Sequence, residues 1–241
     1  MKLILLSVLL LLAVSSLAAG QVNTKSAPVT KCTLTLAQAP QLRGLRLGAN
    51  QAQVLSRFPG LSVDRADELG LSRLRLNLID AGIFLKGSPN RERGVQVDMA
   101  GGTDDGRSFT ADSSRFPDLK GVRRIQLRFL DGRISYVQVG YDDSFKWSSV
   151  EEFAQTVSKN LRLPDGWLDS SDSDSPGKNK ELRCDGFLMT AVIGGDATDS
   201  RMGAQLSLED TAMAQTLEKR QKDQEEKKKR AEEDRRKTFK P

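Results

Sequence analysis

Any chemistry that this chain carries out must proceed without histidine, because none of its 241 residues is a histidine. The absence removes the side chain best suited to proton transfer near neutral pH, and with it the Ser-His and Cys-His pairs of nucleophilic enzymes. It also removes the usual ligand of zinc and haem. Enzymes that use carboxylates, or serine with lysine, pass this filter.

Two short motifs resemble catalytic or metal-binding patterns, and both fail in detail. Ser175 and Lys178 have the Ser-x-x-Lys spacing of serine acylases, but the Pro-Gly between them favours a turn over the helical turn that this chemistry needs. The run from Asp172 to Asp174 begins like a calcium loop, but Arg183 stands where the bidentate glutamate belongs. The sequence therefore predicts no metal site and no cofactor.

Aspartate-rich segments leave one catalytic alternative open. Asp104 and Asp105 lie in one such segment, and the range from Asp165 to Asp174 forms another. Acids that are distant in sequence can converge in a fold to form the carboxylate pair of a glycoside hydrolase. A carboxylate-dependent secreted hydrolase is therefore the alternative function, and the sequence singles out no particular pair.

Cys32 and Cys184 are the two cysteines of the chain. Alternation around the first predicts a strand with Cys32, Leu34 and Leu36 on one face, and Leu182 lies on the same side as Cys184. Both thiols therefore point where apolar residues point. In an oxidising compartment they are expected to form a disulfide between the start and the end of the body, with two separate buried thiols as the alternative.

Residues 1–20 have the layout of a secretory signal peptide. Lys2 supplies the positive charge, an apolar run extends from Leu3 to Val14, and small residues before Gln21 suit a cleavage site. The mature chain is expected to be periplasmic or secreted and not membrane-spanning. An uncleaved membrane anchor is the alternative interpretation.

Residues 21–210 are predicted to form an α+β body with an antiparallel sheet and a few helices packed on one face. Turn dipeptides, capping residues and apolar alternation predict the elements. In order these are a short helix capped by Asn50, strands at 74–78 and 94–99, a hairpin of 122–130 and 133–141, a helix from 148 or 149 to 161, and strands at 181–193 and 204–208. The rest of the polar stretch 86–121 is expected to form loops, and it marks the boundary if the body consists of two small lobes.

The predicted hairpin turns at Asp131-Gly132, and its alternation is imperfect. Leu127 and Phe129 share one face of the first strand, whereas Ile134 falls on the face opposite Val137 in the return strand. A bulge at the turn would change which set faces the core. The sequence leaves this register open.

The segment 211–241 is predicted to be a long charged helix that is partly disordered. Residues 218–241 hold 11 basic and 7 acidic side chains. Acid-to-base pairs four residues apart, such as Glu218 with Lys222, support a helix over 211–238 without any packing, and the apolar seam of a coiled coil is missing.

Two basic clusters in this tail are candidate anion-binding sites, with a merely solvated helix as the alternative. They consist of Lys227, Lys228, Lys229 and Arg230, and of Arg235, Arg236 and Lys237. Nucleic acid is not the expected ligand, because aromatic residues do not interleave the clusters. Anionic envelope polymers or lipid head groups are expected instead. The segment between the signal and the tail holds 25 basic and 25 acidic residues, so a preference for anions is predicted for the tail alone.

A motif follows Leu45: Leu47-Gly48-Ala49-Asn50, then Val54, then Phe58-Pro59-Gly60. It resembles the start of the first helix in small exported α+β domains, which include the outer-membrane-assembly lipoproteins and the β-lactamase-inhibitor proteins. Ala49 and Asn50 stand where that family has methionine and threonine, and its lipidated cysteine has no counterpart here. The resemblance implies a scaffold for protein contacts rather than for catalysis.

Together these observations predict an exported, non-catalytic protein-binding or envelope-assembly module rather than an enzyme. The expected partner is an envelope or secreted protein, and the tail adds a possible contact with anionic envelope polymers.

Overall fold

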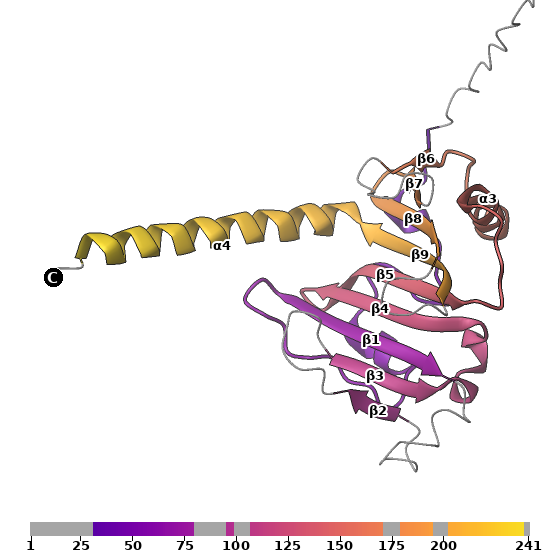
Figure 1. Ribbon diagram of the computed structural model, residues 1–241. Coiled ribbons are helices and arrows are strands. Elements are labelled where there is room, and N and C mark those ends of the chain that lie inside the picture. Colours follow the sequence, from indigo (N-terminus) through magenta and orange to yellow (C-terminus); the bar gives the residue numbers. More distant parts are fainter. Residues whose placement is uncertain (1–30, 80–94, 99–106, 171–178, 195–201, 239–241) are drawn as a thin grey trace, which may run out of the picture.

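The computed structural model describes residues 31–79, 95–98, 107–170, 179–194 and 202–238 (Figure 1). The fold is α+β, as predicted. The strands are β1 (Leu71–Ile79), β2 (Val95–Asp98), β3 (Arg107–Asp112), β4 (Val122–Leu130), β5 (Arg133–Asp142), β6 (Leu168–Asp169), β7 (Asn179–Arg183), β8 (Phe187–Ile193) and β9 (Met202–Asp210). The helices are α1 (Gln51–Leu55), α3 (Val150–Leu161) and α4 (Thr211–Thr238), and the 3-10 turns are η1 (Leu36–Gln38), η2 (Ser113–Arg115) and η3 (Pro117–Leu119).

The described strands form one sheet in the order β2-β3-β1-β4-β5-β9-β8-β7-β6. Neighbouring strands run antiparallel except β1 and β3, which are parallel. Strands on both sides of the predicted lobe boundary thus belong to one sheet, and the division into lobes stays a prediction. Within the described ranges, no helix is long and apolar enough to cross a membrane.

One face of this sheet carries the core, because apolar residues alternate with polar ones along each strand. A single row of register partners shows it: Leu74, Leu127, Val137, Leu208, Met189 and Leu182 face one another across six strands, and each is at most 1% exposed. Helix α3 packs on this face through Phe153 and Val157. The N-terminal segment 32–61 covers the rest of it, behind β1, β4 and β5 in Figure 1.

The hairpin of β4 and β5 settles the register that the sequence left open. Asp131 and Gly132 both have positive φ, 51° and 75°, as a two-residue hairpin turn requires. The pairing shifts by one residue between Arg128 and Phe129. This bulge turns Ile134 onto the same face as Val137, and both are fully buried.

Helix boundaries follow local capping chemistry, as predicted. The Asn50 side chain accepts a hydrogen bond from the Gln53 amide at 2.9 Å, and the Gln53 side chain accepts one from the Asn50 amide at 3.0 Å. Ser149 caps α3 through the Glu152 amide. Helix α4 spans the predicted residues and is capped by the preceding Asp210, whose buried carboxylate accepts from the Met213 amide at 2.9 Å.

Two predictions were wrong: that of a single strand at 181–193, and that of loops through most of 86–121. Residues 181–193 form two strands, because Asp185-Gly186 turns the chain: Gly186 has φ 94°, and the Cys184 amide donates to the Phe187 carbonyl at 3.0 Å. The predicted loop 86–121 contains β3, whose Phe109 is buried. Its pairing with β1 is parallel and distant in sequence, so local turn signals do not reveal it.

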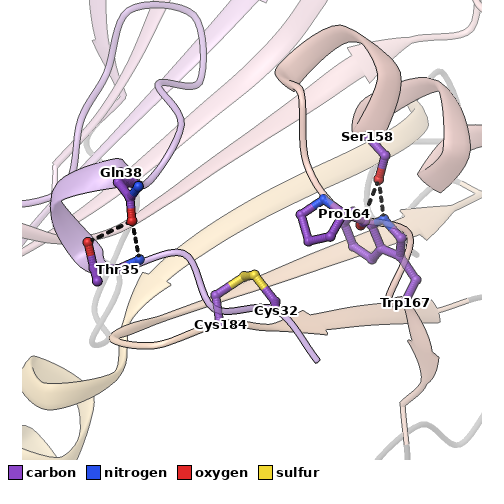
Figure 2. The surroundings of a disulfide bond; sticks show 7 residues. All are labelled: Cys32, Thr35, Gln38, Ser158, Pro164, Trp167 and Cys184. Atoms are coloured by element: carbon purple, nitrogen blue, oxygen red, sulfur yellow. Dashed lines mark hydrogen bonds between the residues drawn. A yellow bond between two sulfur atoms is a disulfide. The ribbon is translucent and has the colours of Figure 1, made fainter. Parts of the chain in front are cut away.

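The segment 32–36 is not a strand, although its alternation correctly predicts which side chains turn inward. Cys32 is buried, and Leu34 and Leu36 are partly buried against the core. The chain turns into η1 instead, because the Gln38 side chain accepts hydrogen bonds from the backbone amide and the hydroxyl of Thr35 (Figure 2).

The predicted disulfide between Cys32 and Cys184 is present, with the two Cα atoms 4.7 Å apart (Figure 2). It ties the N-terminal segment to the turn between β7 and β8, where the Asp185 amide also donates to the Leu34 carbonyl at 2.9 Å. The same segment then crosses to β5, where the Gly48 amide donates to the Ile134 carbonyl at 2.8 Å. We call residues 32–61 the strap, because they join the two halves of the sheet.

We predict that replacing both cysteines (Cys32→Ser with Cys184→Ser) lowers the free energy of unfolding by about 4 to 5 kcal/mol, because the bond closes a very long loop in the unfolded chain. Urea denaturation of the purified protein measures the change, and the reduced wild-type protein serves as the control. A loss below about 1 kcal/mol in both would show that the strap holds without the bond.

Candidate functional site

The sheet face opposite the core carries the most distinctive group of polar side chains in the described chain. Arg73 and Arg75 alternate with buried leucines on β1, and Arg124 and Arg128 alternate with buried residues on β4. In the register of these strands Arg73 lies opposite Arg128, and Asn77 lies opposite Arg124. Because alternate residues share a face, all four guanidinium side chains lie on the same face of two neighbouring strands.

We call this surface the arginine face. Besides its four arginines it contains outward residues of the same and the neighbouring strands: Asn77, Gln126, Tyr136, Gln138, Gln205, Ser207 and Glu209. Four of these side chains are cationic and one, Glu209, is anionic. No described helix covers this face over β1, β4 and β5, which is turned toward the viewer in Figure 1. The neutral body thus has a basic face.

Contacts within the arginine face hold Arg128 in place. Its Nη2 donates to Glu209 Oε1 at 2.8 Å, and its Cζ lies 4.0 Å from the centroid of the Tyr136 ring. Cation–π stacking together with the ion pair orients the planar guanidinium. Burial raises the pKa of Tyr136 above its ordinary value, so the phenol stays neutral and can donate a hydrogen bond.

The centre of the face is a shallow hollow of about 290 Å³, lined by Arg73, Arg75, Gln126, Arg128 and Tyr136, with Leu74 and Leu127 beneath. Arg124 lies beside it and donates through Nε to Asn77 Oδ1 at 3.1 Å. Guanidinium groups present several N–H donors in a planar fork, which matches carboxylate oxygens. The arrangement suits the binding of anionic groups.

The structure places the predicted anion-binding residues of the tail on α4, away from the arginine face. Residues 227–237 are exposed there, and α4 projects from the sheet (Figure 1). Part of their charge is neutralised within the helix: Arg230 pairs with Glu226 at 3.6 Å, and Arg236 pairs with Glu232. Lys237 pairs with Asp234 at 3.6 Å. Anion binding by the two clusters stays a prediction.

The start of α4 is attached to the body, which corrects the expectation of a helix without packing. Arg220 donates through Nη1 to the Leu69 carbonyl at 2.7 Å and to Asp131 Oδ1 at 2.9 Å, and through Nη2 to Asp131 Oδ2 at 2.8 Å. Gln224 adds a hydrogen bond to Glu68 at 2.8 Å. These contacts hold the helix against the turn between β4 and β5, although no residue of α4 is buried.

A carboxylate pair of the kind that the hydrolase alternative needs meets at Lys180. Its Nζ lies 3.0 Å from Glu151 Oε1 and 2.7 Å from Asp169 Oδ1, beside a hollow that Asp165 also lines. The hydrogen bond from Lys180 lowers the pKa of Glu151, whereas a general acid needs a raised one. The described residues include no cluster of three potential metal ligands, and Asp104, Asp105, Asp172, Asp174, Ser175 and Lys178 lie outside the described ranges.

Comparisons of the chain with protein-family models, with curated proteins and with solved structures find no match in any of the three.

We predict that removing residues 227–241 leaves the melting temperature unchanged, because the described residues 227–238 form hydrogen bonds and ion pairs only within their own helix. Removing residues 218–241 also deletes the Arg220 and Gln224 contacts, and it should lower the melting temperature by less than about 4 °C, as expected for exposed polar contacts. Calorimetry of the two truncated proteins makes the comparison. An equal fall in both would show that the far end of α4 packs against the body.

The attachment of α4 should depend on pH. The hydrogen bond from Arg220 lowers the pKa of Asp131 below its ordinary value of 3.8, so the contact contributes fully above that value and is lost as the pH falls through the lowered pKa of the folded state. Nitroxide labels on α4 and β4 should give a narrow distance distribution at pH 6 that broadens in acid.

Asp131→Asn should broaden the same distribution already at pH 6. Glu218→Gln, which removes only the pair with Lys222 inside α4, is the matched control and should keep it narrow. A narrow distribution for Asp131→Asn would show that other contacts orient the helix.

Proposed function

We propose that this chain is an exported, non-catalytic binding module that uses the arginine face to hold an acidic surface of an envelope or secreted protein. The observation that carries the proposal is the gathering of four arginines on two paired strands, in a body that holds equal numbers of basic and acidic residues. Charge separation of this kind favours the approach of a partner of opposite charge.

A protein partner fits the shape and composition of the face. The surface extends over β1, β4, β5 and β9, and its central hollow is too small to enclose a sizeable ligand. Arginine and tyrosine are enriched among the residues that contribute most to protein interfaces. Arg128 stacked on Tyr136 is already ordered, which reduces the entropy that binding would cost.

Export is supported by two independent features. Residues 1–20 have the charge and apolar pattern of a signal peptide, and the disulfide between Cys32 and Cys184 is of the kind that persists in oxidising compartments. The motif at 45–60 resembles exported domains that serve as scaffolds for protein contacts. The basic clusters of the tail add a second possible contact with anionic envelope polymers.

Charge reversal tests the proposal. A photo-crosslinking amino acid at Gln126, in the centre of the arginine face, should form a discrete adduct when the purified protein is added to an envelope extract. Arg73→Glu with Arg75→Glu should reduce the yield about tenfold or more, because the partner surface is acidic. Raising the salt concentration should reduce it as well.

The matched control is Arg235→Glu with Arg236→Glu, which changes the net charge by the same amount in the tail. This variant should keep the adduct. Loss of the adduct in the tail variant alone would assign the binding to α4, and no salt-sensitive adduct from the wild-type protein would overturn the proposal. Circular dichroism confirms that each variant is folded.

A further inference from the structure

A second concave surface lies on the other side of the sheet, where the strap, the connection from β5 to α3 and α3 itself meet. This groove has a volume of about 480 Å³, within the range of about 300 to 1,000 Å³ that is common for small-molecule sites. Four aromatic side chains line it: Tyr141, Phe145, Trp147 and Phe153. We call it the aromatic groove.

The rings of the groove form a connected apolar wall. The Phe153 centroid lies 6.2 Å from that of Tyr141 and 5.1 Å from that of Trp147. Phe145 lies at the rim and is 46% exposed. Its ring lies against Gly121, where a Cβ atom would come within 2.5 Å of Phe145 Cε2. An exposed phenylalanine next to a groove of this size offers apolar surface to a ligand.

Arg43 is the only charged side chain among the described residues that line the groove. Its backbone has φ 52°, a conformation that costs energy outside glycine, in a tight turn closed by two hydrogen bonds between Leu42 and Leu45. The guanidinium carbon lies 5.5 Å from the Tyr141 centroid, and Nη2 donates to the Lys120 carbonyl at 3.4 Å. No carboxylate of the described chain pairs with it, so its charge is available to an anion.

The indole nitrogen of Trp147 is buried and has no hydrogen-bond partner in the described chain. The other tryptophan shows the usual arrangement: Trp167 donates through Nε1 to Ser158 Oγ at 2.7 Å (Figure 2). Buried indole N–H groups normally find an acceptor, because leaving one without a partner is costly. Trp147 lines the groove but its Nε1 is covered, so a ligand oxygen reaches this donor only if the groove wall moves when the ligand binds.

We propose that the aromatic groove binds a small amphipathic carboxylate, with its apolar body against the rings and its carboxylate at Arg43. The single positive charge disfavours a cation, and an uncharged hydrocarbon would offer no counter-charge to Arg43 and no acceptor to the Trp147 indole N–H. The site uses none of the residues of the arginine face. Its ligand is therefore independent of the proposed protein partner, and each proposal can fail without the other.

Head-group selectivity of the wild-type protein is the first test. Isothermal titration with dodecanoate below its critical micelle concentration should give one site per chain. The dissociation constant should be at least tenfold lower than those for dodecanol and dodecyltrimethylammonium. Equal affinity for the three compounds, several sites per chain, or no binding of dodecanoate would overturn the proposal.

Variants then locate the site. Arg43→Gln should weaken dodecanoate binding about tenfold and leave dodecanol binding unchanged. Trp147→Phe, which keeps a ring but removes the N–H donor, should weaken dodecanoate binding several-fold. Trp167→Phe is the matched control, because that indole already has a partner, and it should bind as the wild type does. Unchanged dodecanoate binding by Arg43→Gln would place the ligand elsewhere and contradict the assignment.

Discussion

The disulfide between Cys32 and Cys184 is the constraint on which the arrangement of the domain depends. The core face over β1, β4 and β5 is covered mainly by the strap, which contains the short helix α1, the 3-10 turn η1 and otherwise irregular chain. An irregular segment of this length loses much conformational entropy on folding. The bond fixes one end of the strap to the turn between β7 and β8, and hydrogen bonds to β5 satisfy backbone groups farther along. Cross-linking over so long a loop limits the freedom of the unfolded chain, which offsets part of that cost.

Because the strap and α3 occupy the same side of the sheet, the other side carries polar residues at positions 73, 75 and 77 of β1 and at positions 124, 126 and 128 of β4. The balance of basic and acidic residues in the body predicted a preference for anions in the tail alone, and that prediction took no account of strand register, which brings Arg73 next to Arg128. A sum of charges says nothing about placement, and it is placement that determines the local field.

The features that depend on residues close together in the sequence could be predicted. The caps at Asn50 and Ser149, the turn at Asp131-Gly132 and the bounds of α4 all follow from local hydrogen bonding and backbone preferences. The turn at Asp185-Gly186 carries the same dipeptide signal, and the apolar residues on both sides of it concealed a break that the signal alone could have revealed.

Features that depend on distant pairing were not predictable in the same way. The parallel pairing of β1 with β3 and the contact of Arg43 with Tyr141 join residues far apart in sequence. The arginine face was predictable in part. The alternation of polar and apolar residues in β1 and in β4 is visible in the sequence, but the register that pairs the two strands is not. The disulfide was predictable because only two cysteines exist and both had apolar surroundings, which left a single possible pairing.

The attachment of the start of α4 to the body determines how the arginine face and the basic clusters of the tail can act together. An exposed ion pair contributes little to stability, but the two-point contact of Arg220 with Asp131 has a defined geometry and therefore constrains the direction of the helix. At a rise of about 1.5 Å per residue, the cluster that begins at Lys227 lies about 10 Å beyond Arg220, and the second cluster ends about 25 Å beyond it. These lengths lie within the diameter of a small domain, about 30 Å, so the direction of α4 decides whether one partner on the arginine face would also meet the tail.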